Sequence, residues 1–259
     1  MQNSSDLDKN FESMPEIVDL LKFDRNLIVK NIKELMEDLN DIKRKKPNTI
    51  KQLSRYTKFV EKLTRIVEVP DVRNILENKE SIEELIGKPG IIAEINREIA
   101  PILLSFRGIY EESTSVNSLV NKVENEYRCI TCKKNHTLIC FCCKTNSESV
   151  VKLYRDLRHL AWERGTEELL KENEALLKTL NKNFEINNYF DKIFTAFRNL
   201  YDISSKIAHG DLIEDNTEVK EIWKAINKHD YFRKFFDNLL FFALISLNHK
   251  VTQIGNANN

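Results

Sequence analysis

The stretch Cys129-Ile-Thr-Cys132-Lys-Lys-Asn-His136-Thr-Leu-Ile-Cys140-Phe-Cys142-Cys143 contains all five cysteines of this 259-residue chain. Cys129/Cys132 and Cys140/Cys143 form two Cys-x-x-Cys pairs separated by seven residues. Two tight turns with this spacing can present four thiolates to one tetrahedral Zn²⁺. The sequence therefore predicts a small four-cysteine zinc-binding hairpin over residues 128–146.

A disulfide framework and a redox pair are the alternatives to zinc. The odd cysteine count, the lack of a secretory segment and the lysine-rich composition argue against an oxidising compartment. A thioredoxin-like pair needs a βαβ context, whereas the flanks of this stretch predict helices. Four protein ligands leave no position for a water molecule, so we expect a structural zinc ion. Cys142 is spare in this assignment, and Cys142 or His136 could replace one ligand.

The charge and hydropathy of the chain exclude several classes of protein. Forty basic residues balance forty acidic residues, and 41% of the chain is hydrophobic. These values are typical of a globular protein without an overall field that would attract nucleic acid or lipid. There is no run of eighteen apolar residues, and the first residues lack the pattern of a signal peptide. We therefore expect a cytoplasmic protein that does not associate with a membrane.

The spacing of apolar residues predicts an all-α fold, in agreement with the low count of six glycines and five prolines. Ile28 to Ile42 and Leu53 to Val67 each carry one apolar stripe, which predicts an antiparallel helix pair. Ser13-Met-Pro-Glu16 matches a capping box that would open a short helix through Leu21. The basic run Lys43–Lys46 fits a helix end that complements the helix dipole or a nucleic-acid patch, and we prefer the helix end.

The N-terminal helical region is predicted to span residues 13–127, after a frayed end at 1–12. Within it, helices are expected from Asp71, from Ser81, over Ile91–Phe106 and over Val116–Tyr127. Pro101 is expected to kink or divide the helix over Ile91–Phe106. The chain is then expected to loosen over Gly108–Ser113.

Residues 147–250 are predicted to form a compact antiparallel bundle of four or five helices, with a frayed end at 251–259. The first helical tract starts at Ser147 and is expected to be interrupted at Gly165. A helix from Tyr189 to about Ala208 carries a broad aromatic face that must be buried. The last helix is rich in phenylalanine and contains the apolar run Leu239–Ile245, which is typical of a core helix.

The helix end Phe197-Arg-Asn-Leu-Tyr-Asp-Ile-Ser-Ser-Lys-Ile-Ala-His-Gly210 carries a recognisable pattern. It resembles the signature of the HEPN superfamily, small helical bundles of bacterial and archaeal defence, toxin and RNA-processing systems, which reads approximately Leu-Tyr-x-x-Arg-Ser-Lys-Ile-Val-His-Gly. The matching residues are Leu200, Tyr201, Ser205, Lys206, Ile207, His209 and Gly210. The resemblance covers the C-terminal bundle and not the N-terminal half. It implies a homodimer whose paired motifs line one cleft, where arginine and histidine cleave RNA without metal through attack of the 2′-hydroxyl.

The arginine of the family falls on Ser204 in this chain, five places before His209. Serine lacks the guanidinium fork that clamps a phosphate. Arg198 lies eleven residues before the histidine and is a poor replacement. The resemblance implies His209 as acid/base and Lys206 as a phosphate contact, with Asp202 and Ser204 as polar helpers.

Two functions are compatible with these observations. The first is an RNA-directed protein of a prokaryotic defence or toxin-type system, in which His209 would make the homodimer a metal-independent endoribonuclease. The second is a zinc-stapled helical binding or scaffold module without activity, whose partner would be RNA, a nucleotide or a protein. The second function is open because a histidine followed by glycine is also a common helix C-terminus.

Other candidate residues have simpler explanations. The segment Arg155–His159 could add basic groups to a groove, but a solvated helix face explains it as well. Trp162 and Trp223 fall on apolar stripes, so we expect both in the core and not as base-stacking platforms. The sequence has no glycine-rich phosphate loop, serine nucleophile elbow or His-Glu-x-x-His motif.

Overall fold

The computed structural model describes residues 14–68, 91–114, 148–209 and 231–256. Within these ranges the secondary structure consists of helices, without a strand. The α-helices are α2 (Ile17–Leu20), α3 (Arg25–Lys45), α4 (Ile50–Glu68), α7 (Ile91–Ser113), α9 (Glu148–Glu172), α10 (Glu174–Leu180), α11 (Ile186–His209) and α13 (Tyr231–Asn256), and η1 (Pro47–Thr49) is a short 3-10 helix. The prediction of an all-α fold is confirmed for this part of the chain.

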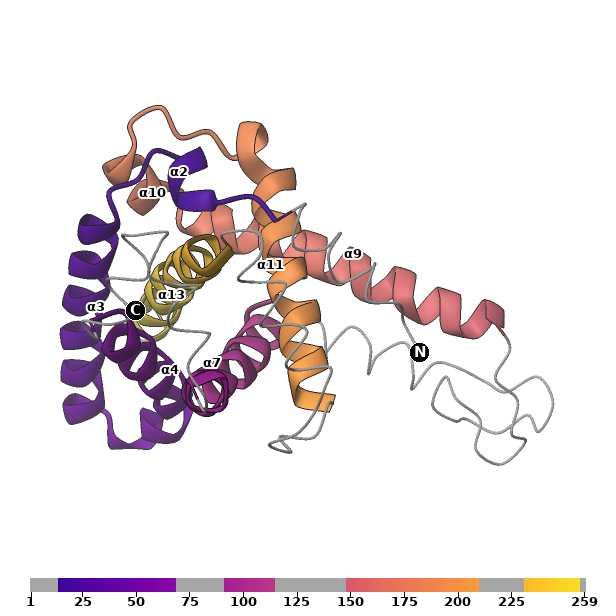
Figure 1. Cartoon of the computed structure of the whole chain (residues 1–259). Coiled ribbons are helices and arrows are strands. Elements are labelled where there is room, and N and C mark those ends of the chain that lie inside the picture. Colours follow the sequence, from indigo (N-terminus) through magenta and orange to yellow (C-terminus); the bar gives the residue numbers. More distant parts are fainter. Residues whose placement is uncertain (1–13, 69–90, 115–147, 210–230, 257–259) are drawn as a thin grey trace. The chain divides into compact units, whose positions relative to one another are not determined.

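Helix α13 lies at the centre of the larger of two compact units. The first unit joins residues 1–109 with 172–259, and the second contains residues 110–171. In the first unit α13 contacts α2, α3, α4 and α11 (Figure 1). Every residue from Phe235 to Leu247 is buried, which requires neighbours on all sides of the helix. The apolar run Leu239–Ile245 is therefore part of a core helix, as its composition predicts.

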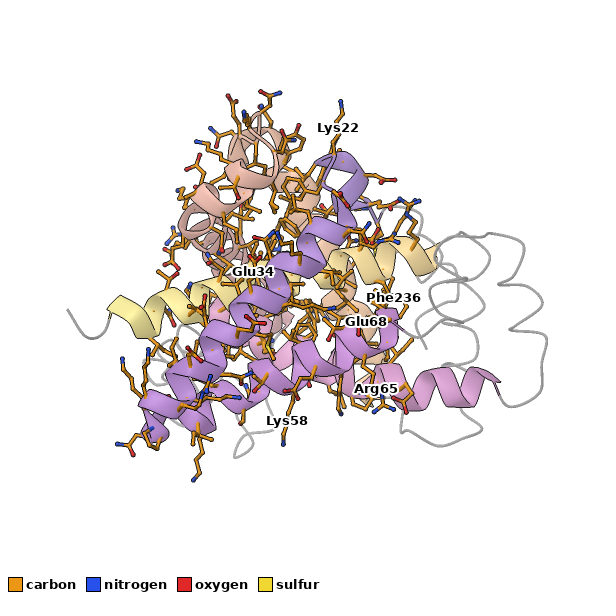
Figure 2. The ribbon with its side chains drawn as sticks, turned by 90° about the vertical axis from the view of Figure 1, so that its left-hand side faces the viewer. Lys22, Glu34, Lys58, Arg65, Glu68 and Phe236 are labelled. Atoms are coloured by element: carbon orange, nitrogen blue, oxygen red, sulfur yellow. The ribbon has the colours of Figure 1, made fainter. Side chains whose placement is uncertain are left out.

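Helices α3 and α4 form the predicted pair and are joined through η1. Their apolar stripes are buried, with Ile28, Ile32, Leu39, Leu53, Val60 and Leu63 all inaccessible or nearly so. Lys43 Nζ donates a hydrogen bond of 2.8 Å to Thr57 Oγ1, so the first residue of the basic run Lys43–Lys46 links the two helices of the pair. The outer surface is charged, and Figure 2 shows Lys58 pointing away from the ribbon, whereas Phe236 of α13 is fully buried.

Phe242 of α13 joins three other helices through aromatic contacts. Its ring centroid lies 4.7 Å from that of Phe106 on α7, 5.3 Å from Phe197 on α11 and 6.2 Å from Phe59 on α4. All three contacts are edge-on, the geometry that the ring quadrupoles favour. Phe197 belongs to the aromatic face of α11, which is buried largely as predicted.

The second unit packs the end of α7 against α9. Tyr110 stacks with Trp162 at a centroid distance of 6.3 Å, and the hydroxyl groups of Tyr110 and Thr166 are 2.9 Å apart. Trp162 is therefore a core residue, as expected. A Cβ atom on Gly165 would lie 2.5 Å from Thr114 Cα, far inside van der Waals contact. The prediction that Gly165 interrupts the helix is wrong, because α9 continues through it and the missing side chain allows this close approach.

The short helix predicted to open with a capping box at Ser13–Glu16 begins at Ile17, and Ser13 lies outside the described ranges. Glu16 has an extended backbone at the N-cap of α2, and its side chain caps nothing. The Pro15 carbonyl oxygen accepts a hydrogen bond from Asn238 of α13, and Glu16 forms an ion pair with Arg233 of the same helix.

Of the two outcomes predicted at Pro101, a kink or a division of the helix, the division does not occur, and the predicted loosening over Gly108–Ser113 is wrong. Helix α7 continues through Pro101 and Gly108, so the chain neither divides nor loosens there. The Ser105 hydroxyl donates to the Pro101 carbonyl oxygen at 2.8 Å, which ties the turn after the proline to it.

Some predictions concern residues outside the described ranges. These are the helices expected from Asp71, from Ser81 and over Val116–Tyr127, the core position of Trp223, and the domain boundaries around residues 128–146. Helix α13 extends to Asn256, beyond the end predicted for the bundle at residue 250. Among the described helices, none combines the length and apolar character needed to cross a bilayer.

Candidate functional site

The motif that resembles the HEPN signature lies at the end of α11. The helix includes all its residues up to His209. Leu200 and Tyr201 are buried, and the Arg107 guanidinium lies 5.3 Å from the centroid of the Tyr201 ring. These two residues of the motif thus belong to the core. Asp202 is partly exposed, and the side chains of Lys206 and His209 lie outside the described part of the structure.

Ser204 occupies the position of the family's arginine and is fully buried. Its hydroxyl donates a hydrogen bond of 2.8 Å to the Tyr201 carbonyl oxygen, which is the usual way a serine within a helix satisfies its donor. A hydroxyl held in this way by the backbone inside one chain has no access to a phosphate in solvent. The geometry gives Ser204 a packing role in the isolated chain.

The predicted zinc ligands Cys129, Cys132, Cys140 and Cys143 lie outside the described ranges, as do Cys142 and His136. Within those ranges, no group of three or more histidine, cysteine, aspartate or glutamate side chains is arranged to hold a metal ion. The zinc hairpin stays a prediction.

The structure assembles a different charged site, which sequence reasoning missed. Five side chains from α2, its N-cap, α3 and α13 form what we call the acid–arginine cluster: Glu16, Asp19, Arg25, Arg233 and Asp237. Asp237 is fully buried at its centre, and Arg25 Nε and Nη2 donate to its two carboxylate oxygens at 2.6 and 2.7 Å. This bidentate pair is the geometry in which a guanidinium best compensates a buried carboxylate.

Arg233 joins the remaining members of the cluster. Its Nε lies 3.1 Å from Glu16 Oε1 and 3.7 Å from Asp237 Oδ2, and its Nη2 donates to Asp19 Oδ1 at 3.2 Å. The Glu16 contact is close but poorly aligned, because the buried Oε1 atom has no hydrogen-bond partner within the described part. When every group is ionised, three carboxylates therefore share two guanidinium groups.

Glu16 binds its proton more tightly than an ordinary glutamate, and this excess of negative charge is one of the reasons. Burial, followed by the nearby Asp19 carboxylate, raises the pKa of Glu16 from 4.5 to about 7, against the opposing effect of Arg233. Burial also raises the pKa of Asp237, although Arg25 and Arg233 act in the opposite direction. The cluster therefore holds a proton more tightly than isolated carboxyl groups do, and burial and Asp19 raise the pKa of Glu16 most clearly.

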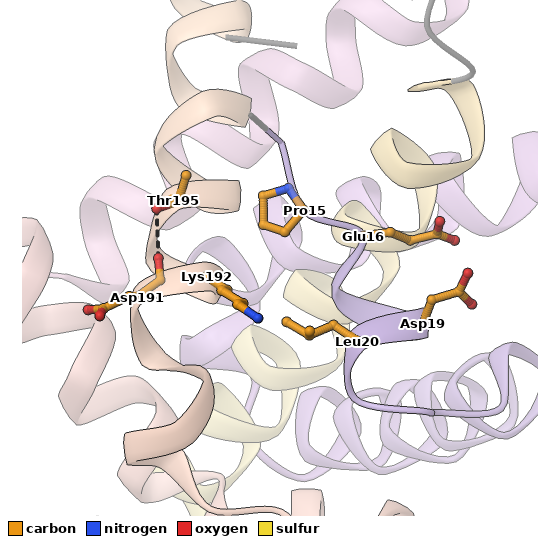
Figure 3. A pocket seen from close by; sticks show the side chains of 7 residues that line it. All are labelled: Pro15, Glu16, Asp19, Leu20, Asp191, Lys192 and Thr195. Carbon is orange, nitrogen blue, oxygen red and sulfur yellow. Dashed lines mark hydrogen bonds between the residues drawn. The ribbon is translucent and has the colours of Figure 1, made fainter. Parts of the chain in front are cut away.

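An open pocket of about 620 Å³ lies beside the cluster, between α2 and α11. Its lining residues are Pro15, Glu16, Asp19, Leu20, Asp191, Lys192 and Thr195. In Figure 3 the Lys192 side chain extends toward Leu20, whereas the Glu16 and Asp19 carboxylates point together to the opposite side. The pocket wall between these groups is mainly the Pro15 ring and the Leu20 side chain.

The sequence draws attention to one residue of this site, Glu16, but its spacing favours a helix cap and not an ion pair. Glu16 fits a capping box by its spacing, whereas its partner Arg233 is more than two hundred positions away in the chain.

The segment Arg155–His159 is a mainly exposed helix face, as the simpler explanation expects. Arg158 is the exception, since it pairs with Glu111 and lies 4.9 Å from the Trp162 ring centroid.

Comparisons with protein-family models, with curated proteins and with solved structures gave no match to this chain. The resemblance to the HEPN superfamily therefore depends on the motif residues of α11 alone.

Proposed function

We propose that this chain is a HEPN-like, RNA-directed protein of a prokaryotic defence or toxin-type system, in which two copies of α11 meet and hold RNA. The observation that supports the proposal is the continuity of α11 through the motif up to His209, with Leu200 and Tyr201 buried. The motif residues after Tyr201, up to His209, follow in the last turns of the same helix. In the proposed site His209 is the acid/base and Lys206 contacts a phosphate, with Asp202 as a polar neighbour.

A second candidate function is favoured by the position of Ser204. Because this residue is buried and bonded to its own helix, no side chain at the family's arginine position reaches the proposed cleft. Loss of a guanidinium clamp removes a large part of the electrostatic stabilisation of a phosphoryl transition state. The second proposal is therefore a homodimeric helical module that binds RNA, a nucleotide or a protein partner without cleaving RNA.

Cleavage and binding of RNA separate the two functions. The purified full-length chain is incubated with end-labelled single-stranded RNA in EDTA, beside His209→Ala and the matched control His159→Ala on α9. The ribonuclease proposal expects cleavage that is lost in His209→Ala and kept in His159→Ala. The binding-module proposal expects retention of RNA on a filter without cleavage. If the chain neither binds nor cleaves RNA, the RNA-directed proposal is wrong, and circular dichroism in the same buffer verifies that the chain is folded.

We also propose that Cys129, Cys132, Cys140 and Cys143 bind one structural zinc ion. The support is the spacing of the cysteines, which suits one tetrahedral ion. Metal analysis of the purified protein should give one zinc ion per chain, and the variant Cys129→Ser with Cys140→Ser should lose it. Equal zinc content in both proteins would refute the proposal.

A further inference from the structure

The segment Met14–Phe23, which we call the latch, is a short piece of chain packed against the core. Besides its contacts with α13 described below, the Leu21 carbonyl oxygen accepts a hydrogen bond of 2.7 Å from Asn181 Nδ2. Its apolar residues Met14, Ile17, Val18, Leu21 and Phe23 are buried. Its helix, α2, has only four residues, far fewer than a helix needs to be stable alone. Lys22, which follows soon after the helix, has a left-handed backbone with φ of 54°, which is strained for a residue other than glycine. The latch therefore depends on its contacts with other helices to keep its conformation.

Polar contacts attach the latch to α13. The Ile17 amide donates to Asn238 Oδ1 at 2.9 Å, and Asn238 Nδ2 donates to the Pro15 carbonyl oxygen at the same distance. Asn238 is fully buried, so these two bonds replace the contacts of its amide with water. The latch also makes ionic contacts with α13, because the Glu16 and Asp19 carboxylates face the Arg233 guanidinium.

Charged groups from several elements surround Glu16. The charged groups that face it are Asp19 on its own element, Arg233 and Asp237 on α13, and Arg25 on α3, while Asp191 and Lys192 of α11 line the adjoining pocket. With a proton on Glu16, two carboxylates are matched by two guanidinium groups. Without it, a third negative charge lies beside them, and its buried Oε1 atom, 3.1 Å from Arg233 Nε, makes no well-aligned hydrogen bond in the described structure.

We propose that the latch is a proton-controlled device, docked on α13 when Glu16 is protonated and released more readily when Glu16 ionises. The sign follows from linkage. The docked state holds the proton more tightly than the open state, because burial raises the pKa of Glu16 from 4.5 to about 7. Docking is therefore strongest below the open-state value and weakens as the pH rises through the docked-state value. Between pH 6 and pH 8 the equilibrium constant for opening should increase roughly tenfold.

Hydrogen exchange of the Ile17 amide measures this opening directly, because opening breaks its bond to Asn238. The protection factor of this amide, corrected for the intrinsic pH dependence of exchange, should fall about tenfold from pH 6 to pH 8. The Leu244 amide in the middle of α13 reports global unfolding and should change much less. In Glu16→Gln the latch should stay docked and the pH dependence should disappear. The matched control Glu34→Gln, on the exposed surface of α3, should keep it.

A carboxyl NMR titration of the wild-type protein provides a test that needs no variant. The proposal expects Glu16 to titrate near neutral pH, and an ordinary value near 4.5 would overturn it. A raised value with an Ile17 protection factor independent of pH would also overturn it, since protonation would then not be linked to opening. Equal changes at Ile17 and Leu244 would show a loss of global stability in place of a latch.

Discussion

Replacing Arg25 by methionine tests whether the acid–arginine cluster holds α3, α2 and α13 together. The substitution keeps most of the side-chain volume but removes both hydrogen bonds to Asp237, at 2.6 and 2.7 Å. Asp237 is then fully buried with Arg233 as its remaining cation in the cluster, 3.7 Å away. Breaking a buried ion pair by removing one partner costs about 3–5 kcal/mol. We expect about 3 kcal/mol, the lower end of that range, because Arg233 remains and the Arg25 side chain is 22% exposed.

The loss should depend on pH in a defined direction. Arg25 lowers the pKa of Asp237 against the larger effect of burial, so its removal raises that pKa further. A carboxyl group whose folded-state pKa is raised contributes stability at low pH that disappears as the pH increases. Arg25→Met should therefore be closest to the wild type in acid and furthest from it at neutral pH and above.

Urea unfolding followed by circular dichroism at pH 5 and pH 7.5 measures both effects. Arg44→Met is the matched control, because Arg44 belongs to an exposed pair with Asp41 and should change stability by less than about 0.5 kcal/mol. Adding Asp237→Asn to Arg25→Met removes the uncompensated charge and should restore part of the loss. If Arg25→Met behaves like Arg44→Met, the cluster contributes little and this reasoning is wrong.

Three further substitutions test the packing. Phe242→Ala should cost about 4 kcal/mol in urea unfolding, since it removes a ring that contacts α4, α7 and α11; a loss below about 1 kcal/mol would contradict its central position. Gly165→Ala should lower the melting temperature, because its Cβ would lie 2.5 Å from Thr114 Cα, whereas Gly255→Ala, with open space around it, should leave it unchanged or raise it. Ser204→Arg should destabilise the protein and not create ribonuclease activity, as the side chain would enter a fully buried position; a folded variant with gained cleavage would show that the motif is open to solvent.

The proposed latch and the proposed RNA site use different parts of α11. Asp191 and Lys192 adjoin the latch near the start of this helix, whereas the motif residues lie at its end. A failure of the RNA experiments would therefore leave the proton-controlled latch unaffected, and the reverse also holds. Glu16→Gln can serve as a folded variant in both sets of experiments.

Part of the candidate site could be predicted from the sequence, because helical motifs are local. The residues of Leu200–His209 by themselves predict a helix end, and α11 ends there. Ser204 follows Leu200 by four residues and Tyr201 by three, so helical spacing places it on their face, and the structure shows that this face is fully buried there. Its bond to the Tyr201 carbonyl oxygen is local to the helix, whereas its complete burial depends on the neighbours of α11.

The sequence by itself determined the all-α architecture, the pairing of α3 with α4 and the core character of α13. These features follow from apolar spacing within single helices, and such spacing is a local property of the chain. Only the tertiary structure decided that α13 packs against α2, α3 and α4 and that Arg25 meets Asp237 across 212 positions. Charges carry no periodic signal for a distant partner, so the acid–arginine cluster exists only because packing brings these side chains together and buries Asp237 at its centre.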